Sequence, residues 1–555
     1  MSEPYLITTA INYPNGRPHI GHAYEGIAAD AIARFQRSRG RDVRLVTGTD
    51  EHGLKMVQTA RAQGRDTLEF ADEMSGYFRA MCEQLNISYD AFVRTSEPRH
   101  HEASIAIWKA MEASGDLYLD RYEGWYSVRD EAFYDESELV GEGDGRLSPQ
   151  GTPVEWTAEE TWFFRLSKYQ DRLLQLYREQ PEFIRPESRR NEVLRFVEAG
   201  LKDLSVSRTS FDWGVPVPGS AGHVMYVWVD ALTTYMTGVG FPDTSGDWAR
   251  YWPANVHLIG KDIVRFHAVY WPAFLMSAGL PLPKQVFAHG FLLSRGEKMS
   301  KSIGNVVDPM ELAERFGTDA LRYFLLREVP FGQDGSYSNE AIVNRVNAEL
   351  ANSFGNLAQR TLSMIHKNLG GVLPASGKAG EDRELLALVE ETVGTEVPEA
   401  FERFAFSVGI EAWMRAVFAC NQYVDGQAPW TLRKTDPERM AAVLGTLVVA
   451  VRQLAEAVAS VIPASADKLL TLIDAGKGGA PIPQPQPLFP RLDHQLSIFH
   501  SRVFPPARGV ILGLLVPDES HFIRPLLWIR STFALELIRP HQFPFPLSRC
   551  GTDHP

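Results

Sequence analysis

Residues 5–37, YLITTAINYPNGRPHIGHAYEGIAADAIARFQR, decide the fold that we predict for this chain. A short β-prone run over residues 5–10 leads through a loop rich in proline and glycine into a helical pattern over residues 20–37. A second strand pattern, VRLVTG at residues 43–48, and another helical pattern from about Leu54 follow. Strand, loop, helix and strand in this order predict the start of a Rossmann-like α/β domain with a parallel sheet.

The remaining sequence predicts an insertion into this sheet and a helix bundle after it. Residues from about 122 to 155 are rich in Asp, Glu and Gly and predict a loop-rich insertion, whereas those from about 339 to 472 are almost continuously helical in pattern. We therefore expect six regions. They are the two halves of the sheet domain at 1–95 and 223–292, an insertion at 96–222, a linking region at 293–340, a helical domain at 341–485 and a tail at 486–555.

The composition limits the cellular compartment and the kinds of partner that we expect for this chain. The three cysteines, Cys82, Cys420 and Cys550, are too far apart for a disulfide framework or a C-x-x-C zinc site. We see no secretory signal and no run of about 18 apolar residues that predicts a membrane span, so we expect a cytoplasmic protein without membrane contact. The 555 residues carry a net charge of −13, but residues 120–144 and 381–402 account for all of it. A nucleic-acid partner is therefore not excluded.

The tail differs from the rest of the chain. No lysine occurs after Lys477, prolines are frequent, and five of the 15 histidines follow Asp493. The segment is either an appended functional element or a tail with no specified fold, and we favour the second interpretation.

A first motif, Pro18-His19-Ile20-Gly21-His22, lies where the predicted first strand and its loop meet the helix. The N-terminus of a helix offers unpaired N–H groups that suit phosphate. His19 and His22 share one face of the first turn, and Gly21 lets a flat base or ribose approach the backbone. Two surface histidines in a turn, or part of a metal site, would show the same pattern.

A second motif, GEKMSKSIGN at residues 296–305, follows the strand pattern at 285–293. Lys298 and Lys301 are cationic donors in a loop flanked by glycines, which suits a clamp that closes on phosphates. Taken alone, such a stretch is more typical of an ordinary solvated loop.

Together, PHIGH and KMSKS resemble the paired motifs of the class I aminoacyl-tRNA synthetases, and the resemblance is closest to the methionyl-tRNA synthetases. It covers roughly residues 4–490 and runs through GTDEHG, FFRLSKYQDRLL, LKDLSVSR, YVWVDALTTY, HLIGKDIVRFHAVYWPAFL, ANSFGNLAQR and NQYVDGQAPWTL. The resemblance implies a ligase that joins methionine to ATP, giving methionyl-adenylate and pyrophosphate. It then implies transfer of methionine to the 3′-terminal ribose of tRNA(Met), for initiation and elongation of translation.

The nucleophile of the first step would be the methionine carboxylate, which is ionised at neutral pH and needs no general base. Catalysis should therefore come from positioning and from neutralising charge on the phosphoryl oxygens. By resemblance, the catalytic residues are His19, His22, Lys298 and Lys301, and ATP, with its Mg²⁺, contacts these four and Gly21. Of the two lysines, Lys301 is the one that we expect to contact ATP directly.

By resemblance, the methionine pocket consists of Ala10, Ile11, Tyr13, Trp228, Leu232, Tyr235, Ile263 and His267, with Asp50 facing the ammonium group. Two of these have structural alternatives, because Asp50 could cap the element after the strand at 43–48 and Trp228 could belong to the core. Asp262 could position pocket residues or ribose.

The anticodon site is implied on the helical domain. Asn352, Asn356 and Arg360 recur every four residues, so they should project from one helix face, and Trp430 after Pro429 offers a stacking surface for an unpaired base. These five residues match the readers of the CAU anticodon in the family. Asn352 and Asn356 could instead be buried polar residues that bridge helices.

Two departures from the family stand out. Many members carry zinc knuckles in the insertion, but residues 133–156 contain no cysteine, so we expect no structural zinc. We recognise no C-terminal dimerisation module after the helical domain, and so expect a monomer. The alternatives are a ligase for another amino acid and a non-catalytic relative that binds tRNA or protein.

Overall fold

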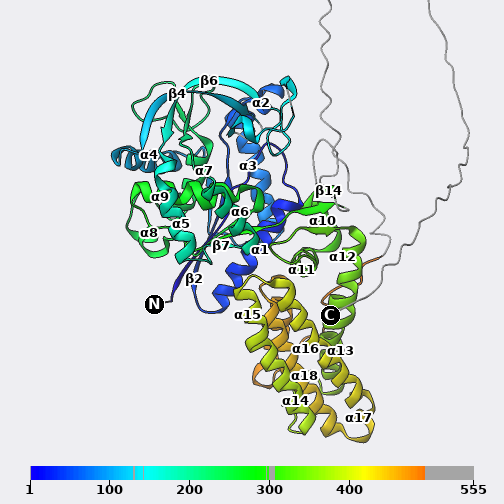
Figure 1. The fold of residues 1–555 in the computed structure, drawn as a ribbon. Coiled ribbons are helices and arrows are strands. Elements are labelled where there is room, and N and C mark those ends of the chain that lie inside the picture. Colours follow the sequence, from blue (N-terminus) through cyan, green and yellow to red (C-terminus); the bar gives the residue numbers. More distant parts are fainter. Residues whose placement is uncertain (1, 129–131, 142, 295–296, 299–306, 494–555) are drawn as a thin grey trace, which may run out of the picture. The chain divides into compact units, whose positions relative to one another are not determined.

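The structure is a computed structural model that describes residues 2–128, 132–141, 143–294, 297–298 and 307–493 (Figure 1). All of these residues belong to one compact unit, Met1–Pro506. Lys301 and residues 494–555 of the predicted tail lie outside the described residues.

A six-stranded sheet in the order β3-β2-β1-β11-β12-β7 forms the centre of the N-terminal part, and every neighbouring pair is parallel. This confirms the predicted Rossmann-like sheet. Sequence order reverses beside β1, and a parallel sheet binds its ligands at the carboxyl ends of the strands near such a switch point. The strands are β1 (Pro4–Thr9), β2 (Asp42–Thr49), β3 (Ala91–Arg94), β7 (Ile184–Arg185), β11 (Val256–Gly260) and β12 (Val286–His289).

Both faces of this sheet are buried. Ile7 and Leu45 pack into one apolar cluster with the helix α1, whereas their chain neighbours Leu6 and Val46 pack into a second cluster on the opposite face. The strands are short and apolar throughout because a parallel sheet has helices on both sides. The helices of this part are α1 (Ile20–Ser38), α2 (Leu54–Ala62), α3 (Thr67–Gln84), α4 (Pro98–Ala113), α5 (Gln170–Glu179), α6 (Glu187–Glu198), α7 (Val227–Thr237), α8 (Gly246–Tyr251) and α9 (Trp271–Ala278).

The insertion contains more regular structure than predicted. An antiparallel sheet in the order β5-β4-β6-β8 includes part of the stretch that we expected to be loop-rich. Acidic residues interrupt the apolar pattern of its two long strands, at Asp120 and Glu123 in the first and at Glu159 and Glu160 in the second. The elements are β4 (Leu117–Ser127), β5 (Ala132–Tyr134), β6 (Glu155–Phe164), β8 (Leu204–Ser205), and the pair β9 (Ser207–Arg208) and β10 (Val224–Met225).

The predicted insertion boundaries, 96–222, are too wide. Strand β7 lies inside that range but pairs with β12 at the edge of the main sheet, and α4 belongs to the same apolar cluster as α7 and α9. A strand of two residues has no periodicity that a sequence pattern could reveal. The linking region after the sheet contains β13 (Leu292–Ser294), β14 (Glu297–Lys298), β15 (Gly335–Tyr337), α10 (Pro309–Phe316) and α11 (Thr318–Glu328).

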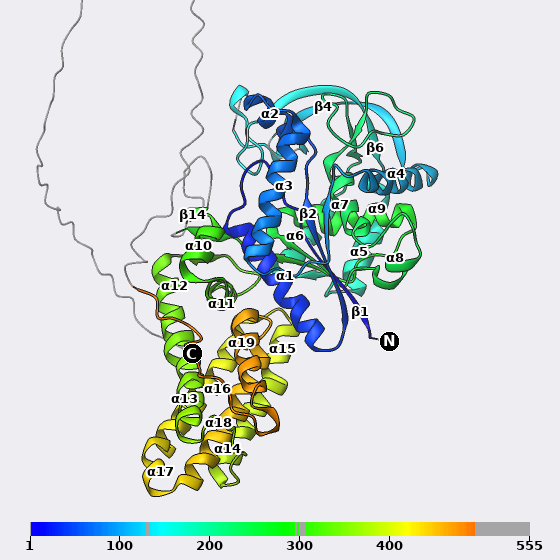
Figure 2. The same ribbon diagram turned by 180° about the vertical axis from the view of Figure 1, so that it is seen from behind.

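The C-terminal part is helical, as predicted (Figures 1 and 2). A π-helical segment, Val346–Gly355, separates the first two helices, so Asn352 and Asn356 do not lie in one uninterrupted α-helix as the spacing of four suggested. The helices are α12 (Asn339–Arg345), α13 (Asn356–Asn368), α14 (Gly380–Glu391), α15 (Val397–Glu402), α16 (Phe406–Gln427), α17 (Pro429–Thr435), α18 (Pro437–Val458) and α19 (Pro463–Asp474).

The helical part continues beyond the predicted boundary at residue 485. Asn347 bonds both backbone groups of Leu492, at 2.8 and 2.9 Å, and Gln359 donates to the Pro485 carbonyl, so residues 483–493 form a return segment along the first helices. Helix α18 is long and apolar enough to cross a membrane by length and composition alone, but 61% of the relevant window is buried within the protein. Core helices of folded domains pass the same test.

Arg322 on α11 joins the two parts of the molecule. Its side chain is completely buried, and its guanidinium donates to the carboxylate of Asp30 on α1 at 2.6 Å. The remaining N–H groups bond to carbonyls at the end of α3 and in the turn between α18 and α19, which are those of Leu85, Asn86, Ser460 and Val461. The pKa of Asp30 lies below its ordinary value, because Arg322 and Arg34 together outweigh the effect of burial.

We expect Arg322→Met to lower the free energy of unfolding by about 3–5 kcal/mol, because it leaves a buried carboxylate and several carbonyls without their donor. The matched control is Arg415→Met, which removes an exposed arginine paired with Glu396 and should change stability by less than about 1 kcal/mol. Urea denaturation followed by circular dichroism measures both. Equal, small effects would contradict the central role of Arg322.

Candidate active site and anticodon surface

The two histidines of PHIGH lie at the start of α1. His19 is the N-cap, and its Nδ1 accepts from the backbone N–H of Gly21 at 3.1 Å, while the backbone N–H of His19 donates to Nδ1 of His22 at 3.0 Å. The rings are stacked, with centroids 3.7 Å apart. In a neutral imidazole whose Nδ1 accepts, the proton is on Nε2. Both histidines are therefore prepared to donate from Nε2.

The local structure also explains why residue 21 is a glycine, apart from the approach of a ligand. A Cβ at this position would lie 2.9 Å from Cε1 of His19, so a larger residue would displace the ring that caps the helix. Glycine therefore allows His19 to fold back over the first turn.

The chain just after the second motif, residues 296–305, contacts the start of α1. The backbone N–H of Ile20, between the two histidines, donates to the carbonyl of Val307 at 3.0 Å, and Val307 lies two residues after the lysine-rich stretch at 296–305. At the other end of that stretch, Lys298 lies in β14 and pairs through its backbone with Leu293 of β13. The fold thus brings PHIGH next to Val307, which lies 287 residues after Ile20 in the sequence.

The implied methionine pocket has an aromatic wall built from α7 and the segment after β11. Tyr235 on α7 and His267 are buried, and the Tyr235 hydroxyl lies 2.6 Å from Nε2 of His267. Nδ1 of His267 lies 3.0 Å from the carbonyl of Ile263, so it carries the proton, and the Tyr235 hydroxyl donates to Nε2. His267 belongs to a π-helical turn, Phe266–Tyr270, a feature that is frequent at functional sites.

Burial determines the ionisation of this wall. It lowers the pKa of His267 to about 4, so the imidazole is neutral at physiological pH. Burial also raises the pKa of Tyr235 well above its ordinary value, and the carboxylates of Glu25 and Asp50 add to that effect. The wall is therefore uncharged, with its hydrogen bonds made internally.

Trp228 is half-buried, so it is not an ordinary core residue. Its ring stacks on Phe266, with centroids 3.8 Å apart and planes 5° apart, and meets His267 edge-on. The sequence interpretation missed Phe266, as well as His257, which lies under Tyr235 at a centroid distance of 4.5 Å. Both occur in HLIGKDIVRFH, but their spacing does not reveal that they support other aromatic side chains.

Among the other implied pocket residues, Leu232 is completely buried, Ala10 is nearly so, and Ile11, Tyr13 and Ile263 are half-buried. Asp262, held open as a positioning residue, is exposed after β11.

Asp50 follows β2 directly, at the carboxyl edge of the sheet, and its side chain is buried. Its backbone N–H donates to the carbonyl of Asn12 in the loop before α1, at 2.8 Å. The cap alternative is wrong, because α2 begins at Leu54 with Gly53 as its N-cap. A buried carboxylate at this edge can meet a cationic group of a ligand.

The predicted anticodon residues gather on the helical part. Asn352 and Asn356 are both exposed, which excludes the alternative that they bridge helices in the core. The Arg360 guanidinium lies 5.2 Å from the centre of the Trp430 ring, which is 44% exposed. Pro429 is buried at the start of α17, so of this pair only Trp430 offers a surface to a base.

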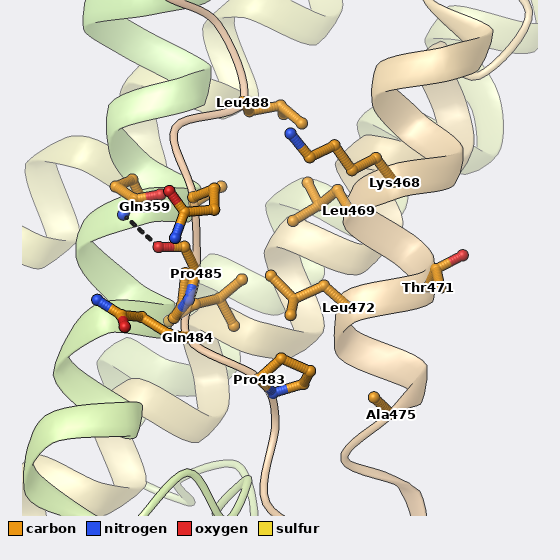
Figure 3. Close-up of a pocket in the computed structure, with 13 residues that line it drawn as sticks. Gln359, Lys468, Leu469, Thr471, Leu472, Ala475, Pro483, Gln484, Pro485 and Leu488 are labelled. Atoms are coloured by element: carbon orange, nitrogen blue, oxygen red, sulfur yellow. Dashed lines mark hydrogen bonds between the residues drawn. The ribbon is translucent and has the colours of Figure 1, made fainter.

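A pocket of about 270 Å³ lies elsewhere, between α13, α19 and the return segment (Figure 3). Its lining is mostly apolar, with Leu469, Leu472 and Leu488 pointing into it. It holds none of the predicted site residues. Within the described ranges, no group of three or more His, Cys, Asp or Glu side chains could hold a metal ion.

Comparison with known proteins decides the family. A family model described as "tRNA synthetases class I (M)" matches residues 5–362, and one described as "Anticodon binding domain of methionyl tRNA ligase" matches residues 373–486. The chain is 59% identical over 505 residues to the methionine–tRNA ligase of Brucella suis, covering 88% of this chain and 98% of that protein. This chain belongs to the methionine–tRNA ligase family.

Other proteins of this family show the same similarity to this chain. The methionine–tRNA ligase of Mycobacterium tuberculosis (strain H37Rv) is 55% identical over 509 residues, covering 88% of this chain and 98% of that protein. A solved structure of the Mycobacterium tuberculosis methionyl-tRNA synthetase in complex with methionyl-adenylate superimposes with a TM-score of 0.85, covering 88% of this chain and all of that one.

The lowered pKa of His267 links stability to pH. The unfolded chain, in which a histidine titrates near 6.5, binds more protons than the folded one as the pH falls toward about 4, so stability is lost over this window. We expect His267 to contribute about 2 kcal/mol of the loss between pH 7 and pH 5. His267→Gln should reduce the difference between urea unfolding free energies at these pH values by that amount. A variant with the wild-type pH dependence would contradict the neutral state of His267.

Proposed function

We propose that this chain activates methionine with ATP to methionyl-adenylate and pyrophosphate, and transfers methionine to the 3′-terminal ribose of tRNA(Met). The hydrogen bond between Ile20 and Val307 carries the proposal, because it joins the first turn of α1, with the two histidines of PHIGH, to a residue two positions after the lysine-rich stretch at 296–305. The N-terminus of a helix itself favours phosphate, and the lysines of that stretch would add positive charge there.

The chemistry follows from the residues. The methionine carboxylate attacks the α-phosphorus of ATP and pyrophosphate leaves, so the developing charge lies on phosphoryl oxygens. His19 and His22 can donate from Nε2 to these oxygens, and Lys298 and Lys301 supply positive charge. Gly21 leaves the backbone of the first turn accessible. ATP enters with its Mg²⁺ as substrate.

The pocket suits a thioether. The hydroxyl of Tyr235 and Nδ1–H of His267 are already bonded within the wall, so the wall presents ring faces and aliphatic groups to the methionine side chain. A polar side chain of equal size would lose its bonds to water without replacement, which disfavours it. Asp50 would hold the ammonium group.

The helical part would read the anticodon of tRNA(Met). Asn352 and Asn356 expose amides, Arg360 exposes part of its guanidinium, and Trp430 supplies a stacking face beside Arg360. Pro429 would act by placing Trp430 at the start of α17.

We also propose a monomeric enzyme of the cytoplasm without structural zinc. The buried, unpaired Cys82 and Cys420 suit a reducing compartment, and the lack of cysteine at residues 133–156 disfavours a zinc knuckle. Sedimentation at micromolar protein concentration measures the oligomeric state.

ATP–pyrophosphate exchange dependent on a single amino acid tests the reaction. We expect exchange with methionine and, under the same conditions, none with isoleucine, leucine, valine or cysteine. Exchange with another amino acid would overturn the specificity, and its absence with every amino acid in folded protein would favour the non-catalytic relative.

The anticodon surface makes a separate prediction. Trp430→Ala should lower kcat/KM for charging of tRNA(Met) roughly 10- to 100-fold, since stacking of one base contributes about 1–3 kcal/mol. It should leave ATP–pyrophosphate exchange unchanged. Phe418→Ala, which removes another exposed aromatic ring of the helical part, is the control and should leave both assays unchanged. Equal losses in both assays for Trp430→Ala would contradict its placement at the anticodon.

A further inference from the structure

A buried carboxylate on α7 joins two imidazoles from distant parts of the chain. Asp230 lies 2.5 Å from Nδ1 of His52 through one oxygen and 2.6 Å from Nε2 of His100 through the other. All three side chains are buried. Burial alone would raise the pKa of Asp230, but the two histidines outweigh it and hold that pKa well below its ordinary value. The carboxylate is therefore ionised and accepts from both rings.

His52 belongs to the loop that carries Asp50. Glu51, which directly precedes His52, is bonded to the main sheet. Arg94 at the end of β3 donates to both carboxylate oxygens of Glu51, at 2.7 and 2.9 Å. Asp50 thus directly precedes two residues that are both held in place, Glu51 by Arg94 of β3 and His52 by Asp230 of α7. Its own backbone N–H is bonded to Asn12.

Helix α7 also carries three residues of the methionine wall. Trp228 and Leu232 lie two positions to either side of Asp230, and Tyr235 lies five positions after it. The bond between Asp230 and His52 is therefore a direct side-chain link between the helix that lines the side-chain pocket and the loop that presents the carboxylate of Asp50.

We propose that Asp230 is a positioning residue for methionine, which acts through His52. It sets the position of the Asp50 carboxylate relative to the wall on α7, so that one methionine molecule satisfies its ammonium group and its side chain at once. The inference rests on the proposed function. Its effect should be large, because a displacement of about 1 Å between binding groups can reduce a rate by about 10²-fold.

The test compares His52→Ala with His52→Asn. Alanine removes the donor to Asp230, whereas the amide nitrogen of asparagine can take the place of Nδ1. We expect His52→Ala to raise the methionine KM in ATP–pyrophosphate exchange at least tenfold, with the ATP KM changed less than twofold. His52→Asn should stay within threefold of wild type. Ser104→Ala, which lies 3.2 Å from His100 but is not part of the loop, is the matched control and should match wild type.

A second measurement separates positioning from general damage. The analogue 4-(methylthio)butanoate keeps the side chain and carboxylate of methionine but lacks the ammonium group. Equilibrium dialysis of wild type, His52→Ala and Asp230→Asn gives the ratio of its Kd to that of methionine. We expect both variants to reduce this ratio at least fivefold, because the contact with Asp50 is what they disturb.

The outcomes are distinct. If the variants weaken both ligands in parallel, or if His52→Ala keeps the wild-type methionine KM, the positioning role is wrong. If wild type itself shows no exchange with methionine, the proposed function fails instead. Should His52→Ala not fold, Asp230→Asn and His52→Asn still decide the question through the same ratio.

Discussion

The buried ion pair between Asp30 and Arg322 fixes the helix on which both ends of the molecule depend. Helix α1 has 19 residues and is therefore about 28 Å long. Its first turn carries His19 and His22, its middle is held by Arg322, and near its end Gln36 donates to Glu402 of the helical part at 3.1 Å. Because Arg322 also bonds carbonyls between α18 and α19, the helix that carries the PHIGH turn is joined directly to the helical part.

The proposed methionine pocket and the proposed anticodon surface differ in the burial of their residues. In the proposed methionine pocket, Tyr235 and His267 are buried and their polar atoms are bonded within the wall, so selection would rest on shape and on the absence of charge in that wall. On the helical part, Asn352, Asn356 and Trp430 are exposed and remain accessible to bases. The acidic stretches at residues 120–144 and 381–402 contain none of these residues, so the net charge of −13 does not act at the proposed reading surface.

Local pattern predicted the elements that follow simple rules. The parallel sheet, α1 and the helical part were predicted because apolar residues recur at strand or helix spacing over enough length. Strand β7 has only two residues, which is too short for an alternating pattern. The π-helical segments shift the spacing of apolar residues by less than one helical turn, so the sequence does not distinguish them from an α-helix. The pairing of β4 with β6 was missed because acidic residues interrupt the apolar pattern of both strands.

Site residues were predictable where a motif carried them and not where tertiary contacts did. His19 and His22 follow from PHIGH, and the structure places them at the N-terminus of α1, where the sequence pattern put them. Phe266, His257, His52 and Asp230 act through partners that are 22 to 178 residues away in the sequence. The signal that could have found Asp230 is a single acid within the apolar run VWVDAL, because an acid in a buried helix requires a partner.

The return segment determines how the protein can be modified. Leu492 is bonded to Asn347, which lies about one helical turn before Asn352 on the π-helical segment. A bulky group inserted directly after residue 493 would start about one helical turn from Asn352, near the surface that we assign to the anticodon, and would compete with tRNA for space. The first strand, by contrast, begins at Pro4 on the amino edge of the sheet, opposite the ligand edge, so immobilisation or labelling at that end leaves both substrate surfaces open.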